Sequence, residues 1–251
     1  MARAAVLGRL TWRLARLVDV TDETATARTL LLEVPGWPGH LPGQHVDVRL
    51  TAPDGYSTQR SYSIASAPDG TRVELTVQVV PDGEVSPYLA GVLNRGDPLE
   101  LRGPVGGYFA WQHTDPAPAL LVGGGSGLVP LMAMARTRAA TAARAPMRLV
   151  VSTRSPATLL YARELAALAT SDDGFSVHVV YTRQAPPGSD EPPGRLDAGR
   201  LQALAFLPAD GPVAFVCGPT GFVETVADLL VASGHDPGRV RTERFGPTGG
   251  S

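Results

Sequence analysis

Several residue types are scarce or missing in this chain of 251 residues, and each absence narrows the chemistry it can perform. All 22 basic residues are arginine, so a Schiff-base or phosphate-binding lysine is excluded. The single cysteine, Cys217, excludes an internal disulfide and an iron–sulfur cluster ligated by cysteines of these residues. The five histidines are scattered with no pair at metal-ligand spacing, so we expect no metal site.

Long hydrophobic runs are also missing from the chain. No stretch is long and apolar enough to span a bilayer, and residues 1–10 lack the apolar run of a signal peptide. The net charge of −2 gives no reason to expect nucleic acid or an acidic membrane as a partner. Hydrophobic residues make up 43% of the chain, which is enough for real cores, so we expect a folded, cytoplasmic protein.

Short β-like segments separated by turns fill the first half of the chain. Residues 29–34 end at a Pro-Gly turn, residues 45–50 alternate valines with polar side chains, and residues 72–79 alternate over their whole length. Several short strands without an intervening helical pattern are typical of a small antiparallel barrel.

One strand-like stretch, residues 60–66, gathers a cation, a phenol and three hydroxyls. Alternation places Arg60 and Tyr62 on one face and Ser61 and Ser63 on the other. The stretch resembles the flavin-binding signature Arg-x-Tyr-Ser of the ferredoxin–NADP(+) reductase family, whose flavin domain is a six-stranded barrel. The resemblance implies that Arg60 meets the flavin phosphates, Tyr62 packs on the isoalloxazine ring and Ser63 reaches flavin N5. We therefore predict that Arg60, Ser61, Tyr62 and Ser63 bind the cofactor.

A second candidate for phosphate binding is Gly-Glu-Val-Ser-Pro at residues 83–87. Ser86 followed by Pro87 predicts a helix N-cap with proline at the first helical position, and a helix start offers free N–H groups to a pyrophosphate. An ordinary capped helix would carry the same pattern. The spacing resembles the Gly-x-x-Ser motif that the family uses here, so we predict that Gly83, Val85 and Ser86 bind FAD.

Strands alternate with helices in the second half, which predicts a parallel doubly wound sheet. We expect strands at 119–122, 147–152, 175–181, 212–216 and 240–242, and helices around 131–135, at 157–169 and at 221–232. Residues 111–118 contain two prolines and little apolar pattern, so they separate the two halves. The predicted fold is therefore an FAD-binding antiparallel six-stranded β-barrel at residues 1–113, followed by an NAD(P)-binding α/β doubly wound parallel sheet at residues 114–251.

A glycine-rich loop follows the first strand of the second half directly. Residues 123–130 read Gly-Gly-Gly-Ser-Gly-Leu-Val-Pro, and strand, glycine loop and helix in this order are typical of a dinucleotide-binding fold. The spelling differs from the common Gly-x-Gly-x-x-Gly and resembles the Gly-x-Gly-x-Gly-x-x-Pro loop of the reductase family. The resemblance implies that the nicotinamide dinucleotide is bound by Gly124, Gly125, Ser126 and Gly127.

Two arginines, Arg154 and Arg183, fall just beyond the second and third strands of this half, where a parallel sheet binds its ligands. Family members that prefer NADPH hold its 2′-phosphate with Ser-Arg or a similar pair after the third strand, and Thr182-Arg183 fits that position. Arginine there supplies a permanent charge and a bidentate donor fork, although a solvated arginine in an arginine-rich chain would look the same. We predict binding by Arg154, Thr182 and Arg183, with NADP as cofactor and NAD as the alternative.

Cys217, Gly218 and Pro219 follow the fourth strand of the second half. A lone buried cysteine is usually a packing residue, but this triplet resembles the family's Cys-Gly-Pro, whose thiol lies beside the nicotinamide ring. Glu243 and Phe245 resemble a Glu-x-Phe of the family, whose carboxylate lies close to the flavin. The resemblance implies that Ser63, Cys217 and Glu243 are catalytic, that Cys217, Gly218, Pro219 and Phe245 contact the cofactors, and that Cys217 positions the ring rather than acting as a nucleophile.

These residues together imply an FAD-dependent NAD(P)H oxidoreductase of the family they resemble. Hydride would pass from nicotinamide C4 to flavin N5, and the electrons would then pass to a separate ferredoxin or iron–sulfur carrier, as in an oxygenase electron-transfer chain. Two alternatives stay open. A two-electron reductase would pass hydride to a quinone or a free flavin, and a regulatory subunit would bind nucleotides without turnover.

Overall fold

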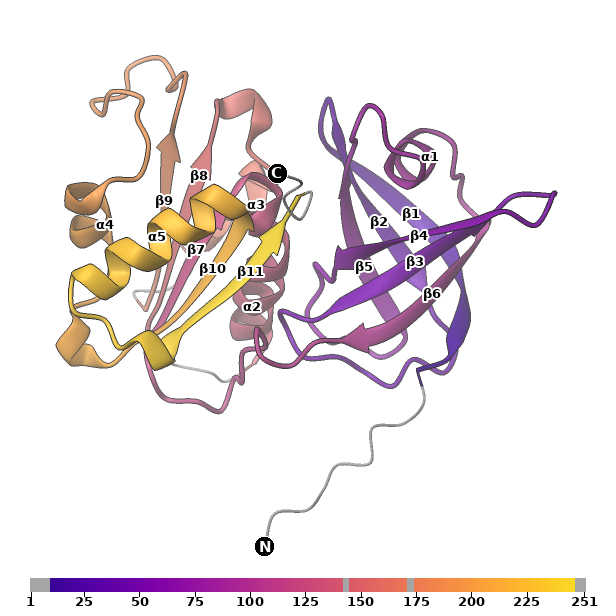
Figure 1. Ribbon diagram of the computed structural model, residues 1–251, viewed down its shortest axis with the longest axis horizontal. Coiled ribbons are helices and arrows are strands. Elements are labelled where there is room, and N and C mark those ends of the chain that lie inside the picture. Colours follow the sequence, from indigo (N-terminus) through magenta and orange to yellow (C-terminus); the bar gives the residue numbers. More distant parts are fainter. Residues whose placement is uncertain (1–9, 142–144, 171–173, 247–251) are drawn as a thin grey trace, which may run out of the picture.

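The chain folds into two halves that lie side by side, an antiparallel barrel and an open α/β sheet (Figure 1), and this confirms the predicted fold class. The computed structural model describes residues 10–141, 145–170 and 174–246. The barrel strands are β1 (Trp12–Thr24), β2 (Ala27–Glu33), β3 (His45–Thr51), β4 (Ser57–Ser63), β5 (Arg72–Gln78) and β6 (Pro98–Val105).

The barrel forms because each strand presents one apolar face to a common core. β1 is 13 residues long and pairs antiparallel with both β2 and β6, which gives the order β4-β3-β6-β1-β2-β5. A bridge between Ile64, the residue after β4, and Leu75 of β5 joins the two edge strands and closes the barrel. The core contains fully buried aliphatic residues: Leu30, Leu32, Val46, Val48, Ile64, Val73, Leu75, Val77 and Leu101.

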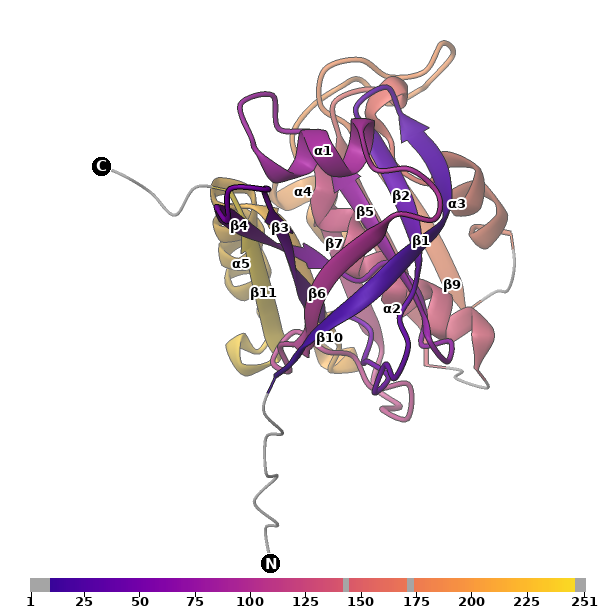
Figure 2. The same cartoon turned by 90° about the vertical axis from the view of Figure 1, so that its right-hand side faces the viewer.

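One short helix, α1 (Val85–Gly91), lies across an end of the barrel (Figure 2) and packs Leu89 into its core. The predicted cap is wrong, because the helix begins at Val85 with Glu84 as the N-cap residue and no capping side chain. Ser86 is therefore inside the first turn. Its hydroxyl accepts a hydrogen bond from the backbone N–H of Val80 at 3.0 Å, so it ties the preceding turn to the helix instead of capping it.

The second half is a five-stranded sheet in which every neighbouring pair of strands is parallel. Its elements are β7 (Ala119–Gly124), η1 (Gly125–Gly127), α2 (Leu128–Ala140), β8 (Met147–Thr153), η2 (Pro156–Thr158), α3 (Ala162–Leu168), β9 (Phe175–Tyr181), α4 (Ala198–Leu204), η3 (Pro208–Asp210), β10 (Val213–Pro219), α5 (Thr220–Ala232), η4 (Pro237–Arg239) and β11 (Val240–Phe245). The strand order is β11-β10-β7-β8-β9, so it reverses between β7 and β10, where such sheets bind ligands. Helices α2 and α3 cover the face towards the barrel, and α4 and α5 cover the other face.

The helix predicted at residues 157–169 is divided, and this is a second correction. The 3₁₀ turn η2 ends at Thr158, and α3 begins only at Ala162. Between them Tyr161 has a φ of 55°, in the left-handed region that side-chain-bearing residues rarely adopt. The backbone turns here because Tyr161 is held by the barrel: its N–H donates to the carboxylate of Glu23 at 3.0 Å, and its hydroxyl donates to Thr76.

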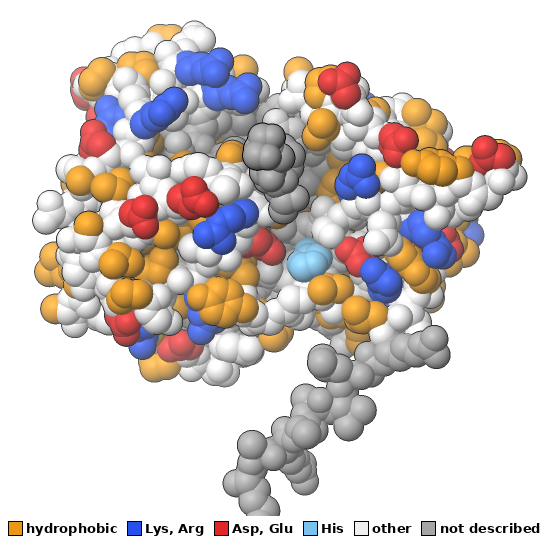
Figure 3. Space-filling model, viewed as in Figure 1, with side chains coloured by type: hydrophobic (Ala, Val, Ile, Leu, Met, Phe, Trp, Pro, Cys, Tyr) orange, Lys and Arg blue, Asp and Glu red, His pale blue; other side chains and the backbone are white. Residues whose placement is uncertain are grey.

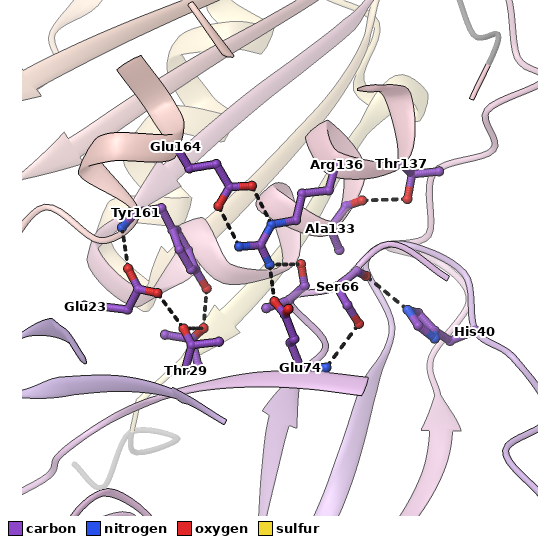
Figure 4. A network of polar contacts seen from close by, with 12 residues as sticks. Glu23, Thr29, His40, Ser66, Glu74, Ala133, Arg136, Thr137, Tyr161 and Glu164 are labelled. Carbon is purple, nitrogen blue, oxygen red and sulfur yellow. Dashed lines mark hydrogen bonds and ion pairs between the residues drawn. The ribbon is translucent and has the colours of Figure 1, made fainter. Parts of the chain in front are cut away.

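A polar network joins the two halves (Figure 4). Arg136 of α2 donates to the carboxylate of Glu74 in β5 at 2.7 Å and to the carbonyl of Ala65 at 2.9 Å. Its remaining nitrogens bind both oxygens of Glu164 in α3, at 2.7 and 2.6 Å. The same side of the barrel also packs Ala27 and Ala65 into the apolar cluster under α2 and α3. The two halves therefore share a core, and the space between them has a fixed shape.

The connection from β6 to β7 contains the predicted division after residue 113. Its Phe109 and Trp111 are buried in the cluster that both halves share. Gly43 lies against this connection with a φ of 97°, and a Cβ there would come within 2.2 Å of the carbonyl oxygen of Phe109. Only glycine fits at this position, so the turn before β3 is also a packing point between the halves.

Candidate functional site

β4 ends beside the α/β half. Ser63 pairs in register with His45 of β3, and the ring of His45 lies 3.8 Å from the carboxylate of Glu243 in β11. Ser63 is 6% exposed, and its hydroxyl has no hydrogen-bond partner among the described residues. Leaving a buried hydroxyl unpaired costs free energy, so the position fits a ligand atom that would pair with it.

The other residues of the flavin stretch divide between two faces. Tyr62 is half-buried against the barrel core, and burial raises its pKa to about 12, so the phenol stays protonated at neutral pH. Arg60 is exposed on the same face, and its guanidinium donates only to nearby groups, including the carbonyl of Gln59 at 2.7 Å. Ser61 lies on the opposite face and donates to Asp47 at 2.7 Å. Arg60 and Tyr62 can therefore meet a flavin nucleotide, whereas the hydroxyl of Ser61 is already engaged.

Gly83, Val85 and Ser86 lie where the chain enters α1. Val85 and Ser86 are buried. Because the oxygen of Ser86 already accepts from Val80, its hydroxyl proton is the part left to donate to a phosphate. A Cβ on Gly83 would come within 3.1 Å of the carbonyl oxygen of Val80, so a larger residue would press on this turn. Binding of the FAD pyrophosphate here stays a prediction.

Many of the predicted nucleotide residues meet in one pocket of about 260 Å³ at the carboxyl ends of β7 and β8. The pocket is lined by six of them: Gly124, Gly125, Ser126, Arg154, Thr182 and Pro219. It is also lined by six residues that the sequence analysis missed: Gln78, Ser152, Thr153, Thr158, Leu160 and Phe222. Gln78 comes from β5 of the barrel, so both halves bound the pocket.

The glycine loop is packed too tightly for a side chain at two of its positions, Gly124 and Gly127. A Cβ on Gly127 would come within 2.1 Å of the carbonyl oxygen of Cys217, and one on Gly124 within 2.7 Å of the ring of Phe222. The loop therefore lies directly against the end of β10 and the start of α5. This close approach leaves the backbone of η1 as the floor of the pocket, which is how a glycine loop receives a pyrophosphate.

Arg154 and Arg183 lie side by side beyond β8 and β9. The N–H of Arg183 donates to the carbonyl of Arg154 at 3.0 Å, and the N–H of Thr182 donates to the carbonyl of Thr153 at 2.8 Å. Both guanidiniums are exposed, and Arg154 lines the pocket whereas Arg183 lies outside it. Figure 3 shows basic side chains gathered at this end of the α/β half. A phosphate at the mouth of the pocket would meet two permanent charges.

Cys217 and Glu243 are neighbours in register on β10 and β11, with Sγ 3.8 Å from Oε2. Burial raises the pKa of Glu243 to about 7. Burial raises the pKa of Cys217 well above its usual value, and the Glu243 carboxylate raises it further. Cys217 is therefore a neutral thiol at neutral pH, the state that suits a positioning group and not a nucleophile. Glu243 can hold or release a proton near neutral pH.

Sequence reasoning missed His45 as part of this site. His45 begins the predicted strand that precedes the flavin stretch, so only an assignment of the register between these two strands would have placed it opposite Ser63. Phe245 is half-buried against the cluster under α2 and α3, so its ring lies at the junction of the two halves. Gly218 packs against Phe222 and the backbone of Gly124, which joins the end of β10 to the glycine loop.

Within the described ranges, no group of three or more histidine, cysteine, aspartate or glutamate side chains is placed to hold a metal ion. The helices of these ranges are all too short or too polar to cross a membrane.

Two family models match successive parts of the chain. An oxidoreductase FAD-binding domain matches residues 14–110, and an oxidoreductase NAD-binding domain matches residues 121–228. With the barrel, the parallel sheet and the pocket between them, these matches define a two-domain oxidoreductase that binds FAD and a nicotinamide nucleotide. The chain belongs to the ferredoxin reductase family, which confirms the resemblance seen in residues 60–66 and 123–130.

Similar proteins include reductase components of oxygenases. The chain is 37% identical over 245 residues to the glycine betaine monooxygenase reductase subunit of Pseudomonas aeruginosa, covering 94% of this chain and 64% of that protein. It is 32% identical over 216 residues to the ferredoxin–NAD(P)(+) reductase component of the naphthalene 1,2-dioxygenase/salicylate 5-hydroxylase systems of a Ralstonia species, covering 83% and 61%. The chain thus spans somewhat less than two thirds of the length of these relatives.

Solved structures share the same two-domain arrangement. The FAD/NAD-binding domain of a Vibrio cholerae nitric oxide dioxygenase superposes with a TM-score of 0.80 at 26% identity, covering 94% of this chain and 99% of that one. A cytochrome P450 reductase from Amycolatopsis superposes with a TM-score of 0.82 at 27% identity, covering 97% and 74%.

Proposed function

We propose that this protein is an FAD-dependent NAD(P)H oxidoreductase that passes electrons to a separate ferredoxin or iron–sulfur protein of an oxygenase system. One observation carries the proposal most strongly. At the junction of the two halves, Ser63 ends the flavin strand with a buried, unpaired hydroxyl, and the Cys217–Glu243 pair lies two residues before the ends of β10 and β11. The groups that would border the two reacting rings therefore converge on one place.

The residues present fit both nucleotides. FAD, when bound, supplies the redox chemistry, since it accepts two electrons together and can release them singly. Arg60 and Tyr62 would hold the flavin nucleotide, and the hydroxyl of Ser63 would pair with the reactive edge of its ring. The floor of η1 and the guanidinium of Arg154 would hold the dinucleotide phosphates. Cys217, as a neutral thiol, would orient the nicotinamide ring, and the shared core would exclude water.

The choice of electron acceptor rests on the relatives and on the cysteine content. Two relatives are named as reductase components of oxygenase systems. Cys217 alone cannot ligate an iron–sulfur cluster, so the group that receives the electrons lies outside these 251 residues. The positions of Thr182 and Arg183 support NADPH over NADH as the donor. The cytoplasmic location stays a prediction.

An anaerobic absorbance titration tests the proposal. The purified protein is titrated with NADPH and separately with NADH, and we expect the oxidised-flavin spectrum to bleach with one equivalent of donor. The variant Ser63→Ala should keep the flavin but be reduced about 10–100 times more slowly, the effect of losing one hydrogen bond to a charged group. Ser176→Ala is the matched control, because Ser176 of β9 also has a buried, unpaired hydroxyl and lies outside the site.

Several outcomes would contradict the proposal or the role that it gives to Ser63. A protein that stays colourless after addition of FAD, or whose flavin NAD(P)H does not reduce, would be a nucleotide-binding subunit without turnover. Turnover with a quinone or free flavin at a rate that no iron–sulfur protein improves would make it a two-electron reductase. Equal effects of the Ser63 and Ser176 substitutions would remove Ser63 from the reaction centre.

A further inference from the structure

His45 lies at the one place where the barrel presents an imidazole to the β10–β11 edge of the sheet, as far as the structure describes the chain. It is the first residue of β3 and pairs with Ser63 of β4 and with Val105 of β6. Residues directly opposite each other in antiparallel strands share a face, so the imidazole and the Ser63 hydroxyl are on the same side of the barrel wall. In Figure 3 a histidine side chain lies at the groove between the two halves, with acidic side chains on either side.

The imidazole faces a carboxylate of the other half. Nδ1 of His45 is 3.8 Å from Oε1 of Glu243, and Oε2 of Glu243 is 3.8 Å from the thiol of Cys217. The His45 and Glu243 side chains are 26% and 20% exposed, whereas Cys217 is fully buried. Glu243 therefore lies between the buried thiol of Cys217 and the partly exposed imidazole of His45. A small rotation of the His45 ring, or one bridging water, would complete the contact between His45 and Glu243.

The charged and polar groups around the pair come from four strands. Burial lowers the pKa of His45, and the charge of Asp47 on β3 opposes this shift. Arg102 of β6 and Ser61 of β4 bind Asp47, so its charge is largely satisfied. On the other side, β11 contributes Glu243 itself, whose pKa burial raises to about 7. The barrel and the sheet thus place a base and an acid against each other, and the Glu243 carboxyl can take up or lose a proton near neutral pH.

We propose that His45 and Glu243 form a proton-transfer pair that moves the proton released in NAD(P)H oxidation from the buried site to solvent. This inference rests on the proposed function. One NAD(P)H and two one-electron acceptors yield NAD(P)⁺, two reduced acceptors and one proton, so each turnover requires a path for that proton. Glu243 takes the proton on the inner side and passes it to Nδ1 of His45, and His45 loses it to water at the rim of the groove.

The first test measures the pair without turnover. The imidazole pKa of His45 is followed by NMR in the holoprotein and in Glu243→Gln, with His45→Gln used to assign the signal. Losing the facing carboxylate should lower the His45 pKa by about one unit, while the pKa of His178 on β9 stays constant. If Glu243→Gln does not fold, the carboxyl pKa of Glu243 is measured in His45→Gln instead, where it should change. A pair that titrates independently in both measurements would overturn the inference.

The second test follows the proton itself. Proton release is recorded with a pH indicator in anaerobic stopped flow, using NADPH and a one-electron acceptor. His45→Ala should slow proton release about 100-fold, and added imidazole should restore part of the rate. His178→Ala is the control, because it removes a half-buried histidine on a strand remote from the groove. If added imidazole does not restore proton release in His45→Ala, and the pH profile of the rate is unchanged, His45 is a structural residue only.

The two tests also separate this inference from the proposed function. A wild-type flavin that NAD(P)H cannot reduce would contradict the proposed function, and the NMR titration would still decide whether the pair shares a proton. Normal reduction together with independent titration of His45 and Glu243 would contradict the pair alone.

Discussion

At the scale of single residues, the chemistry of this protein depends on where strands end. Arg183 and Arg154 owe their proximity to the parallel pairing of β8 and β9, which continues past the strand ends through the Arg183–Arg154 backbone hydrogen bond at 3.0 Å. Neither guanidinium is buried, so both keep the freedom to close on a ligand. Replacing either arginine should therefore change the affinity for a ligand and not the free energy of unfolding.

Replacing Arg183 by alanine should weaken NADPH binding selectively. The substitution removes a permanent charge and a bidentate donor next to the pocket mouth, which costs about 1.5–3 kcal/mol when the partner is a phosphate. We expect the Kd for NADPH to rise about 10–100-fold and the Kd for NADH to change little, measured by difference spectroscopy or calorimetry. Arg72→Ala is the control, because Arg72 is an exposed arginine at the far end of β5 from Gln78. Parallel losses for both nucleotides would show that Arg183 does not recognise a 2′-phosphate.

The residues that sequence reasoning found and missed differ in one physical respect. Cys217, Glu243 and the glycine loop are recognisable because each is fixed by its own local motif. Gln78 and His45 belong to barrel strands whose side chains alternate regularly, so their sequences show only a strand. They join the site because the halves dock in one particular way, and docking depends on contacts between residues far apart in the chain.

At the scale of elements, the glycine loop can pack against the end of β10 only because Gly127 has no side chain. Gly127→Ala should destabilise the protein by about 1–3 kcal/mol or more, because its Cβ would overlap the carbonyl oxygen of Cys217 at 2.1 Å, and backbone cannot easily move away. Gly221→Ala is the matched control, because Gly221 lies in α5 with nothing within 4 Å of an added Cβ. It should be neutral or stabilising by up to about 1 kcal/mol. Urea unfolding followed by circular dichroism measures both, and equal effects would contradict the packing argument.

The predicted boundaries of helices and strands agree with the structure where contacts between neighbouring residues dominate. The strand predicted at 175–181 has the same bounds in the structure, because its aromatic and β-branched residues favour an extended chain. The predicted cap at Ser86 was wrong because the hydroxyl found a partner in the preceding turn, at Val80. The predicted helix at 157–169 was wrong because contacts of Tyr161 with the barrel, through Glu23 and Thr76, outweigh its helical preference.

At the scale of the whole molecule, the two halves act as one body because polar and apolar contacts coincide. The Tyr161 hydroxyl meets Thr76, and Thr76 and Thr29 share a further hydrogen bond at 2.8 Å between β2 and β5. Arg136 binds one carboxylate of each half, Glu74 and Glu164. Since the pocket and the His45–Glu243 contact both lie between the halves, any loosening of this interface would disturb the site from a distance.

Replacing Arg136 by methionine should test this connection. The aliphatic side chain keeps most of the packing but leaves the carboxylates of Glu74 and Glu164 without their shared cation. We expect the free energy of unfolding to fall by about 3 kcal/mol, the lower end for a buried pair, because the two glutamates are 30% and 36% exposed. Flavin reduction by NADPH should slow although no residue of the pocket has changed.

The matched control is Arg28→Met. Arg28 binds Asp22 at 2.6 Å, but the two side chains are 39% and 70% exposed, so this surface pair should contribute less than about 1 kcal/mol. Calorimetry and stopped-flow reduction would be measured on both variants. If Arg136→Met lost no more stability than Arg28→Met, the network of Figure 4 would not hold the halves together. If Arg136→Met lost stability but kept the wild-type reduction rate, the apolar cluster that contains Phe109 and Trp111 would be sufficient to keep the flavin and nicotinamide rings aligned.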